Sequence, residues 1–173
     1  MNFISQSIRI DFQKSICFSL FLLLSGISVK AQKDENSGSL RKQVGASDNN
    51  NEISELLFKL GEYYLTKPGE LKKDLDSADY FNQQAQQISV KTQNKLIIGK
   101  SLLLDAKIER ERKNKTAAFT KIKKVISYSE RNKLIQQAGE GYEELSFTYD
   151  NDPENFEVRI KLKEKALQLY KSS

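Results

Sequence analysis

The side chains of this sequence that could perform acid–base or metal chemistry are mainly carboxylates, because it contains no histidine and only one cysteine, Cys17. Glu143 and Glu144 form one candidate pair, but adjacent residues on a helix do not face each other and make a poor acid–base couple. The run 150–152 (DND) resembles the start of a calcium loop, yet it lacks the later glycine and the distal glutamate. Helix capping explains this run better. An enzyme remains the competing class, and we expect no catalytic residue, no metal and no cofactor.

Residues 1–31 have the features of a signal peptide. A polar start precedes an apolar run, 15–27, which is shorter than the roughly 20 residues that a membrane-spanning helix needs. Val29 and Ala31 supply small residues where signal peptidase requires them, which predicts cleavage before Gln32. We therefore expect a periplasmic or secreted protein with no stable membrane span after cleavage; an uncleaved anchor is the alternative. Cleavage would remove Cys17, so no disulfide is expected.

The net charge does not indicate a nucleic-acid-binding protein. The whole chain carries +5, and loss of residues 1–31 lowers this to +3, because that segment has three basic residues and one acidic residue. Segment 107–124 is locally basic and is a candidate anion-binding patch. Glu109 and Glu111 are interleaved among its basic residues, however, and Phe119 alone offers little aromatic surface for base stacking. We favour a solvated helix end, and we expect no nucleic-acid partner.

Residues 32–51 are predicted to be a disordered linker, and residues 52–173 a helical repeat domain. The linker segment has few apolar residues, several serines and glycines and a run of asparagines. Such a segment buries too little surface to offset the loss of chain entropy.

Helical spacing of apolar residues and capping signals predict six helices after the linker. They run from the N-cap Asn51 to Lys67, from about Asp76 to Lys91, from Asn94 to about Arg112, from Lys115 or Thr116 onward, from about Asn132 to Tyr149, and from Pro153 to about Tyr170. For the last of these, Asp152 is the expected N-cap and Pro153 the first helical residue.

The apolar pattern repeats at about forty residues, from Ala85 to Val125 to Ala166. Residues 94–97 (NKLI) also recur as 132–135. A fixed period in this range is typical of stacked helix pairs, because no single pair buries its apolar side alone. We expect an all-α, right-handed α-solenoid of about three helix-turn-helix units.

The expected helices resemble tetratricopeptide repeats (TPRs). In the first helices, 60–64 (LGEYY) and 145–149 (LSFTY) place a small residue before an aromatic one; in the second helices, 78–85 (ADYFNQQA) and 164–170 (EKALQLY) follow the family's small–aromatic–alanine spacing. The middle unit departs from the pattern at Asp105-Ala106, Glu109 and Val125, and the period is longer than usual. The resemblance covers residues 52–173 and implies a surface that binds a protein or peptide.

In TPR proteins the first helices line an inner, concave face, and their inward positions transfer to this chain one by one. The positions implied are Phe58, Glu62 and Leu65, then Lys100, Leu103, Lys107 and Arg110, then Glu140, Glu143 and Phe147. Apolar anchors flanked by both signs of charge suit a protein segment better than a small anion. For any single residue, ordinary packing or solvation is the simpler explanation.

A narrower resemblance is to the extracytoplasmic TPR region of bacterial sensor histidine kinases, carried by 67–78 (KPGELKKDLDSA) and 165–173 (KALQLYKSS). It implies a sensory input module, the truncated sensor region of a two-component system; the alternative is a free-standing periplasmic adaptor or scaffold. The residues that close the sequence, including Leu167 and Tyr170, are predicted to leave an uncapped apolar edge available for self-association or a partner. The alternative is an outer face that Arg159, Lys163 and Lys171 make polar.

Overall fold

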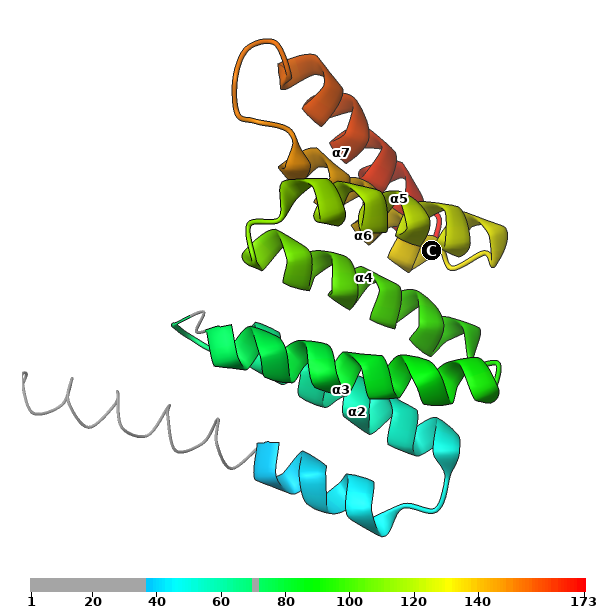
Figure 1. Cartoon of the computed structure of the whole chain (residues 1–173). Helices are drawn as coiled ribbons and strands as arrows, with labels where there is room; N and C mark the ends of the chain where they lie inside the picture. Colours follow the sequence, from blue (N-terminus) through cyan, green and yellow to red (C-terminus); the bar gives the residue numbers. More distant parts are fainter. Residues whose placement is uncertain (1–36, 70–71) are drawn as a thin grey trace, which may run out of the picture. The chain divides into compact units, whose positions relative to one another are not determined.

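The computed structural model describes residues 37–69 and 72–173, which are helices and short connections without a β-strand among them (Figure 1). The chain divides into two units, residues 1–39 and 40–173, and the second contains the helices discussed here. The signal peptide predicted for residues 1–31 lies outside the described residues. The helices are α2 (Asn50–Leu65), α3 (Lys72–Lys91), α4 (Lys95–Glu111), α5 (Lys115–Arg131), α6 (Ile135–Thr148) and α7 (Phe156–Lys171). The all-α prediction is confirmed.

The linker prediction is wrong for residues 37–46, which are helical. Within the second unit, Leu40 and Val44 pack against the core formed by α2, α3 and α4. The guanidinium of Arg41 donates to the hydroxyl of Tyr64 at 3.0 Å and lies 4.9 Å from the ring centroid of Phe81. The prediction rested on the polar composition of the segment and did not take account of Leu40 and Val44. These two apolar residues are four positions apart and therefore lie on one side of a helix.

The N-cap of α2 is also two residues earlier than predicted. The side chain of Asn49, not Asn51, accepts hydrogen bonds from backbone N–H groups of the first turn, at 2.9 Å from Asn51. The predicted start of α3 is likewise about four residues too late, since the helix begins at Lys72.

Three connections between helices share one geometry and recur every twenty residues. Gln93, Lys113 and Lys133 have φ values of 56°, 60° and 58°, in the left-handed region of backbone conformation that residues other than glycine rarely adopt. In each case the next residue's N–H bonds to a carbonyl five residues earlier at 2.9 Å, which is the six-to-one bond of a Schellman motif. These loops reverse the chain in three residues. The forty-residue period therefore consists of two helical steps of twenty.

The start of α7 differs from the sequence prediction. The side chain of Asp152 accepts a hydrogen bond from the N–H of Asn155 at 2.8 Å, so it caps a turn rather than the helix. Pro153 belongs to that turn, and the helix begins three residues later, at Phe156. The capping chemistry was identified correctly, but it stabilises a preceding loop.

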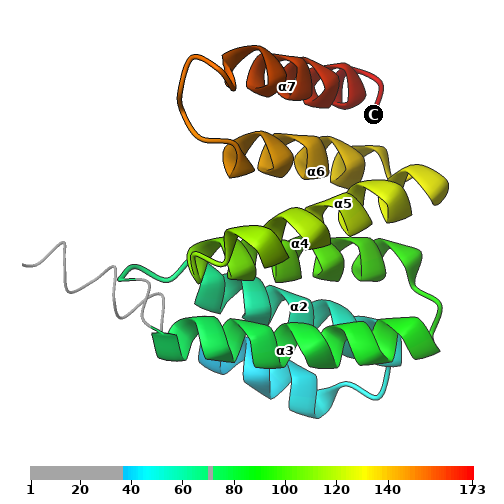
Figure 2. The same cartoon turned by 45° about the horizontal axis from the view of Figure 1, so that its top comes forward.

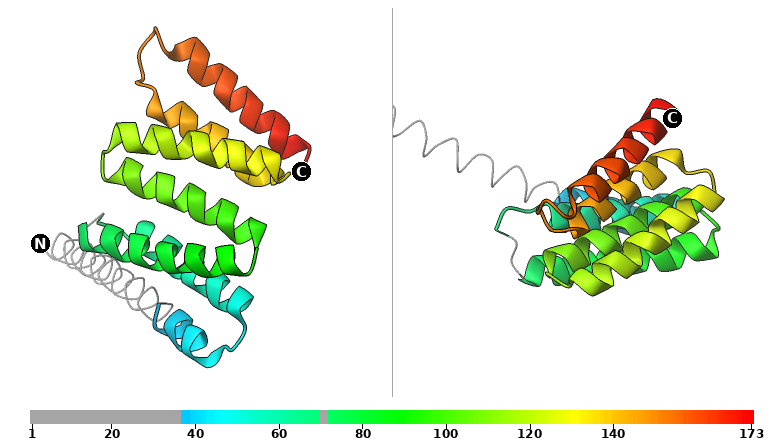
Figure 3. Two further views of the ribbon diagram at one scale, coloured as in Figure 1. Left: turned by 45° about the vertical axis from the view of Figure 1, so that its right-hand side comes forward. Right: turned by 90° about the horizontal axis from the view of Figure 1, so that it is seen from above.

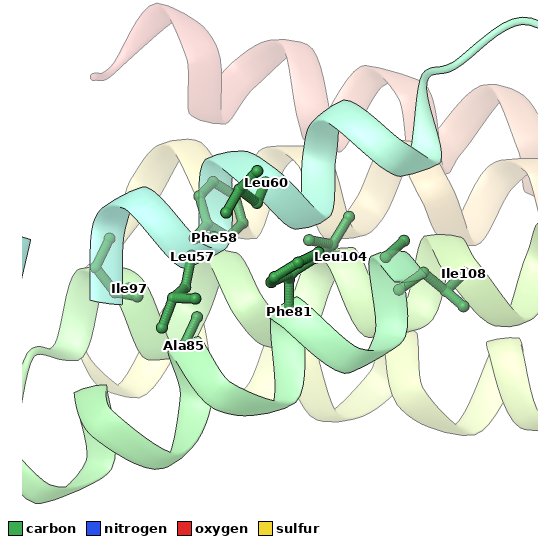
Figure 4. Packing of buried hydrophobic residues seen from close by; sticks show 9 residues of the cluster. Leu57, Phe58, Leu60, Phe81, Ala85, Ile97, Leu104 and Ile108 are labelled. Carbon is green, nitrogen blue, oxygen red and sulfur yellow. The ribbon is translucent and has the colours of Figure 1, made fainter. Parts of the chain in front are cut away.

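The repeated apolar positions lie in the core. Ala85 and Val125 are fully buried and Ala166 is 3% exposed. Around them, one cluster joins α2, α3 and α4 (Figure 4), and a second joins α4, α5 and α6. Close approach of α2 to α3 depends on Gly61: a Cβ there would lie 2.9 Å from Leu104 Cδ2 and 3.2 Å from the carbonyl oxygen of Ala78.

Each helix from α2 to α7 packs against the next one, and consecutive helices run in opposite directions (Figure 2). In addition, α4 contacts both α2 and α6, whereas α3, α5 and α7 make no contact with one another. The alternate helices α2, α4 and α6 are therefore closer together than their partners. This arrangement brings side chains from three helices to one face.

Candidate functional site

A cavity of about 240 Å³ lies between α2, α4 and α6. Its lining residues come from the end of α2, the middle of α4 and the start of α6. They are Phe58, Glu62, Leu65, Thr66, Lys100, Leu103, Leu104, Lys107, Gln136, Gln137 and Glu140.

Most of the residues predicted to form an inner face lie around this cavity. Seven of the ten line it: Phe58, Glu62, Leu65, Lys100, Leu103, Lys107 and Glu140. Arg110 lines an adjoining hollow of about 390 Å³, together with Leu65, Lys107 and Glu144. Glu143 accepts a hydrogen bond from the hydroxyl of Tyr170 at 3.0 Å, and Phe147 lies further along α6.

The three predicted apolar anchors differ in how much surface they offer. Phe58 is 6% exposed and Leu103 is 4% exposed, and each belongs to a core cluster. Phe147, by contrast, is 46% exposed, and the cations of Arg110 and Lys163 lie 5.9 and 5.4 Å from its ring centroid. Phe58 and Leu103 therefore form the floor of the cavity, while Phe147 has free surface that another molecule can contact.

Ion pairs between α4 and α6 close one side of the cavity. Lys107 Nζ lies 3.6 Å from Glu140 and 3.9 Å from Glu144, and Arg110 also pairs with Glu144. Burial raises the pKa of the Glu144 carboxyl above its usual value, although the positive charges of Arg110 and Lys107 oppose the shift. Because these cations are already engaged with carboxylates, they hold the two helices together.

Two charged side chains at the cavity are not held in this way. Among the described residues, neither Glu62 nor Lys100 forms a salt bridge or a side-chain hydrogen bond; the Lys100 ammonium lies 5.7 Å from the Phe58 ring centroid. Glu62 is exposed, yet the surrounding protein desolvates its carboxyl and raises the pKa, against the lowering effect of Lys100 and Lys107. The cavity thus presents one carboxylate and one ammonium whose hydrogen-bonding capacity is available.

Sequence reasoning missed the amide side chains at the cavity, Gln136 and Gln137. Gln137 is buried, and the Nε2 of Gln136 donates to Glu140 Oε1 at 3.3 Å. Both lie one helical turn before Glu140, and that spacing is the signal that could have identified them. They add donors and acceptors that suit a peptide backbone.

The locally basic segment 107–124 is largely neutralised by acidic neighbours. Lys121 Nζ lies 2.7 Å from Asp105 and 3.0 Å from Glu109. Arg112 pairs with Glu109, Asp76 and Asp79. Burial alone would raise the pKa of Glu109, but hydrogen bonding and charge from Lys121, with the charge of Arg112, hold it below its usual value. This network ties α3, α4 and α5 together on a side other than the cavity.

The chain matches no protein-family model, and no curated protein or solved structure is similar to it at a significant level. None of the helices in residues 37–69 and 72–173 combines the length and the apolar character needed to cross a membrane.

Proposed function

We propose that residues 52–173 form a non-catalytic interaction module, a right-handed α-solenoid of three TPR-like helix pairs that binds a protein or peptide through α2, α4 and α6. The observation that carries the proposal is the gathering of seven of the ten transferred positions around one cavity. Those positions were transferred from the TPR pattern to three separate helices, and their meeting at one cavity supports the proposal.

Packing at other positions of the repeat also supports a TPR-like architecture. Gly61, Ala106 and Ser146 occupy the small-residue position of the three first helices, and all three are buried. Contacts of α4 with α2 and α6, without matching contacts among α3, α5 and α7, are expected when the first helices line the inner side of a solenoid.

The cavity favours a peptide side chain over a drug-sized molecule. Its volume of about 240 Å³ is below the roughly 300–1,000 Å³ of typical small-molecule sites. A buried apolar floor, an available ammonium at Lys100, an available carboxylate at Glu62 and the Gln136 amide suit one side chain of an extended segment with its flanking polar groups. The exposed ring of Phe147 provides a second contact along the same face.

We further propose that the module works outside the cytoplasm, as the sensory input region of a two-component system or as a free-standing periplasmic adaptor. The signal-like residues 1–31 support export. Recovery of a chain beginning at Gln32 from the periplasmic fraction, measured by mass spectrometry, is the expected outcome. An intact N-terminus in the membrane fraction would identify an anchor instead.

The binding site can be tested by photo-crosslinking in envelope extract. A photoreactive phenylalanine analogue placed at Gln136, at the cavity, should crosslink a partner; the same analogue at Lys124, an exposed position on α5, is the matched control. The double substitution Glu62→Lys/Lys100→Glu preserves net charge and should abolish the Gln136 crosslink. Equal crosslinking from both positions, or persistence in the double variant, would refute a role for the cavity.

A further inference from the structure

The last helix, α7, lies at one end of the row of helices (Figure 3), and one of its sides carries an exposed apolar stripe. Phe156, Ile160 and Leu167 are 62%, 40% and 51% exposed. Their spacing of four and seven residues places them on one side of the helix. Ala166, which is buried, lies on the side that packs against α6. The stripe is therefore separate from the core-facing side of α7.

The equivalent side of α5 is covered by the helix that follows it. Val125 of α5 and Ala166 of α7 occupy the same repeat position, and both are buried. The residues that follow them, Ile126 and Leu167, therefore also correspond to each other. Ile126 is only 8% exposed, and its Cγ1 would lie 2.8 Å from a Cβ on Gly141 of α6. In this repeat, the surface that contains Ile126 on α5 is therefore where an antiparallel helix packs. No described residue covers the equivalent surface, which contains Leu167, on α7.

Charges are segregated along the same helix and the turn before it. The acidic residues Glu154 and Glu157 lie at the N-terminal end. The basic residues Arg159, Lys161, Lys163, Lys165 and Lys171 follow toward the C-terminus, with Glu164 the exception. Lys161 Nζ lies 2.6 Å from Glu157 within the helix, and all of these side chains except Arg159 are exposed. Two such helices side by side repel when parallel and attract when antiparallel, because the acidic end of one then meets the basic end of the other.

We propose that the stripe is a homodimer interface, in which α7 of a second copy of this chain lies antiparallel against it about a two-fold axis. A two-fold interface uses the same patch on both copies and must be self-complementary, as a charge-segregated antiparallel helix pair is. With the axis between Lys163 and Glu164, Ile160 faces Leu167 of the second copy and Glu157 approaches its Lys171. Each α7 then packs against the apolar stripe of the other as α6 packs against the Ile126 side of α5.

The first test measures the mass of the purified full chain by light scattering after size-exclusion chromatography, over a range of concentrations. The expected mass is twice that of one copy of the purified chain, which is 19.8 kDa when residues 1–31 are retained. Ile160→Lys should raise the dimer dissociation constant about tenfold or more, because a charge replaces a desolvated interface residue. Val158→Lys is the matched control, since Val158 is equally exposed at 40% but lies on the opposite side of α7. Circular dichroism should show unchanged helicity in both variants.

A charge swap tests the antiparallel geometry. Glu157→Lys and Lys171→Glu should each weaken the dimer, and both changes together in one chain should restore it. A monomer at all concentrations, equal effects of the Ile160 and Val158 substitutions, or no rescue in the double variant would overturn the proposal. The crosslink from Gln136 should persist in Ile160→Lys, so failure of this interface is distinguishable from failure of the proposed binding face.

Discussion

Replacement of Gly61 by leucine should destabilise the fold, because it forces α2 away from α3. A Cβ at this position would lie 2.9 Å from Leu104 Cδ2, 3.2 Å from the carbonyl oxygen of Ala78 and 3.5 Å from the backbone nitrogen of Asn82. The end of the Leu104 side chain can move, but the two backbone atoms belong to α3 and cannot move without shifting that helix. The remaining carbons of leucine would have to enter a core whose neighbours, Leu60 and Ala78, are almost completely buried.

The magnitude follows from two opposing contributions. Overpacking of a close-packed core costs about 1–3 kcal/mol, and the bulk of a leucine side chain places Gly61→Leu toward the upper end. Removing a glycine from a helix interior returns about 1 kcal/mol of helix propensity. The net loss is therefore about 2 kcal/mol, which lowers the melting temperature of a chain of this size by about 4–8 °C. Gly61→Ala adds only the Cβ, and its two contributions should nearly cancel.

Thermal unfolding followed by far-ultraviolet circular dichroism measures this effect. Gly45→Ala is the matched control, because Gly45 is also helical but has no atom within 4 Å of the point where a Cβ would lie. That variant should melt at or slightly above the wild-type temperature. If Gly61→Leu melts as high as Gly45→Ala, the close approach of α2 and α3 does not depend on the missing side chain, and the TPR-like interpretation of the first helix pair fails with it.

Two further substitutions test the packing and the charge network. Ile122→Ala should lower the free energy of unfolding by about 2–5 kcal/mol, because Ile122 is fully buried between α4, α5 and α6. Lys124→Ala, on the exposed side of α5, should change it little; chemical denaturation measures both. The lowered pKa of Glu109 means that its ionised form favours folding, so its contribution is complete above its unfolded pKa of about 4.5 and is lost as the pH falls through the lower folded-state value. Melting temperatures measured from pH 7 downward should therefore fall less steeply in Glu109→Gln than in wild type, and parallel curves would show that Lys121 and Arg112 do not stabilise the Glu109 carboxylate.

Local sequence predicted most helices well but not all of their ends. Asn94 was expected to begin the third helix, and its side chain does accept a hydrogen bond from the N–H of Ile97 at 3.2 Å. Lys113 and Lys133 carried no comparable signal, because a lysine in a left-handed turn looks like any surface lysine in the sequence. Their conformation is imposed by the helices that they join, whose terminal carbonyls need hydrogen-bond donors.

The candidate site was predicted from the TPR resemblance, whose inward positions follow helical spacing. Residues at intervals of three or four share a side of a helix, so Lys100, Leu103 and Lys107 lie on one face of α4. Spacing within one helix carries no information about the facing helix. Gln136 and Gln137 were missed for that reason, since their place at the cavity depends on how α6 packs against α4.

The sequence by itself determined the helical class, the buried positions of the repeat and the sides on which charges lie, because these depend on local periodicity and on residue type. Tertiary structure alone decided which of those side chains are available. Phe58 and Phe147 are both aromatic residues of the predicted inner face, yet packing of α2 against its neighbours buries the first, while the second remains 46% exposed. Lys107 and Lys100 likewise share a face of α4, but only Lys107 meets carboxylates from α6. Burial and pairing are properties of two or more helices together, and no single helix encodes them.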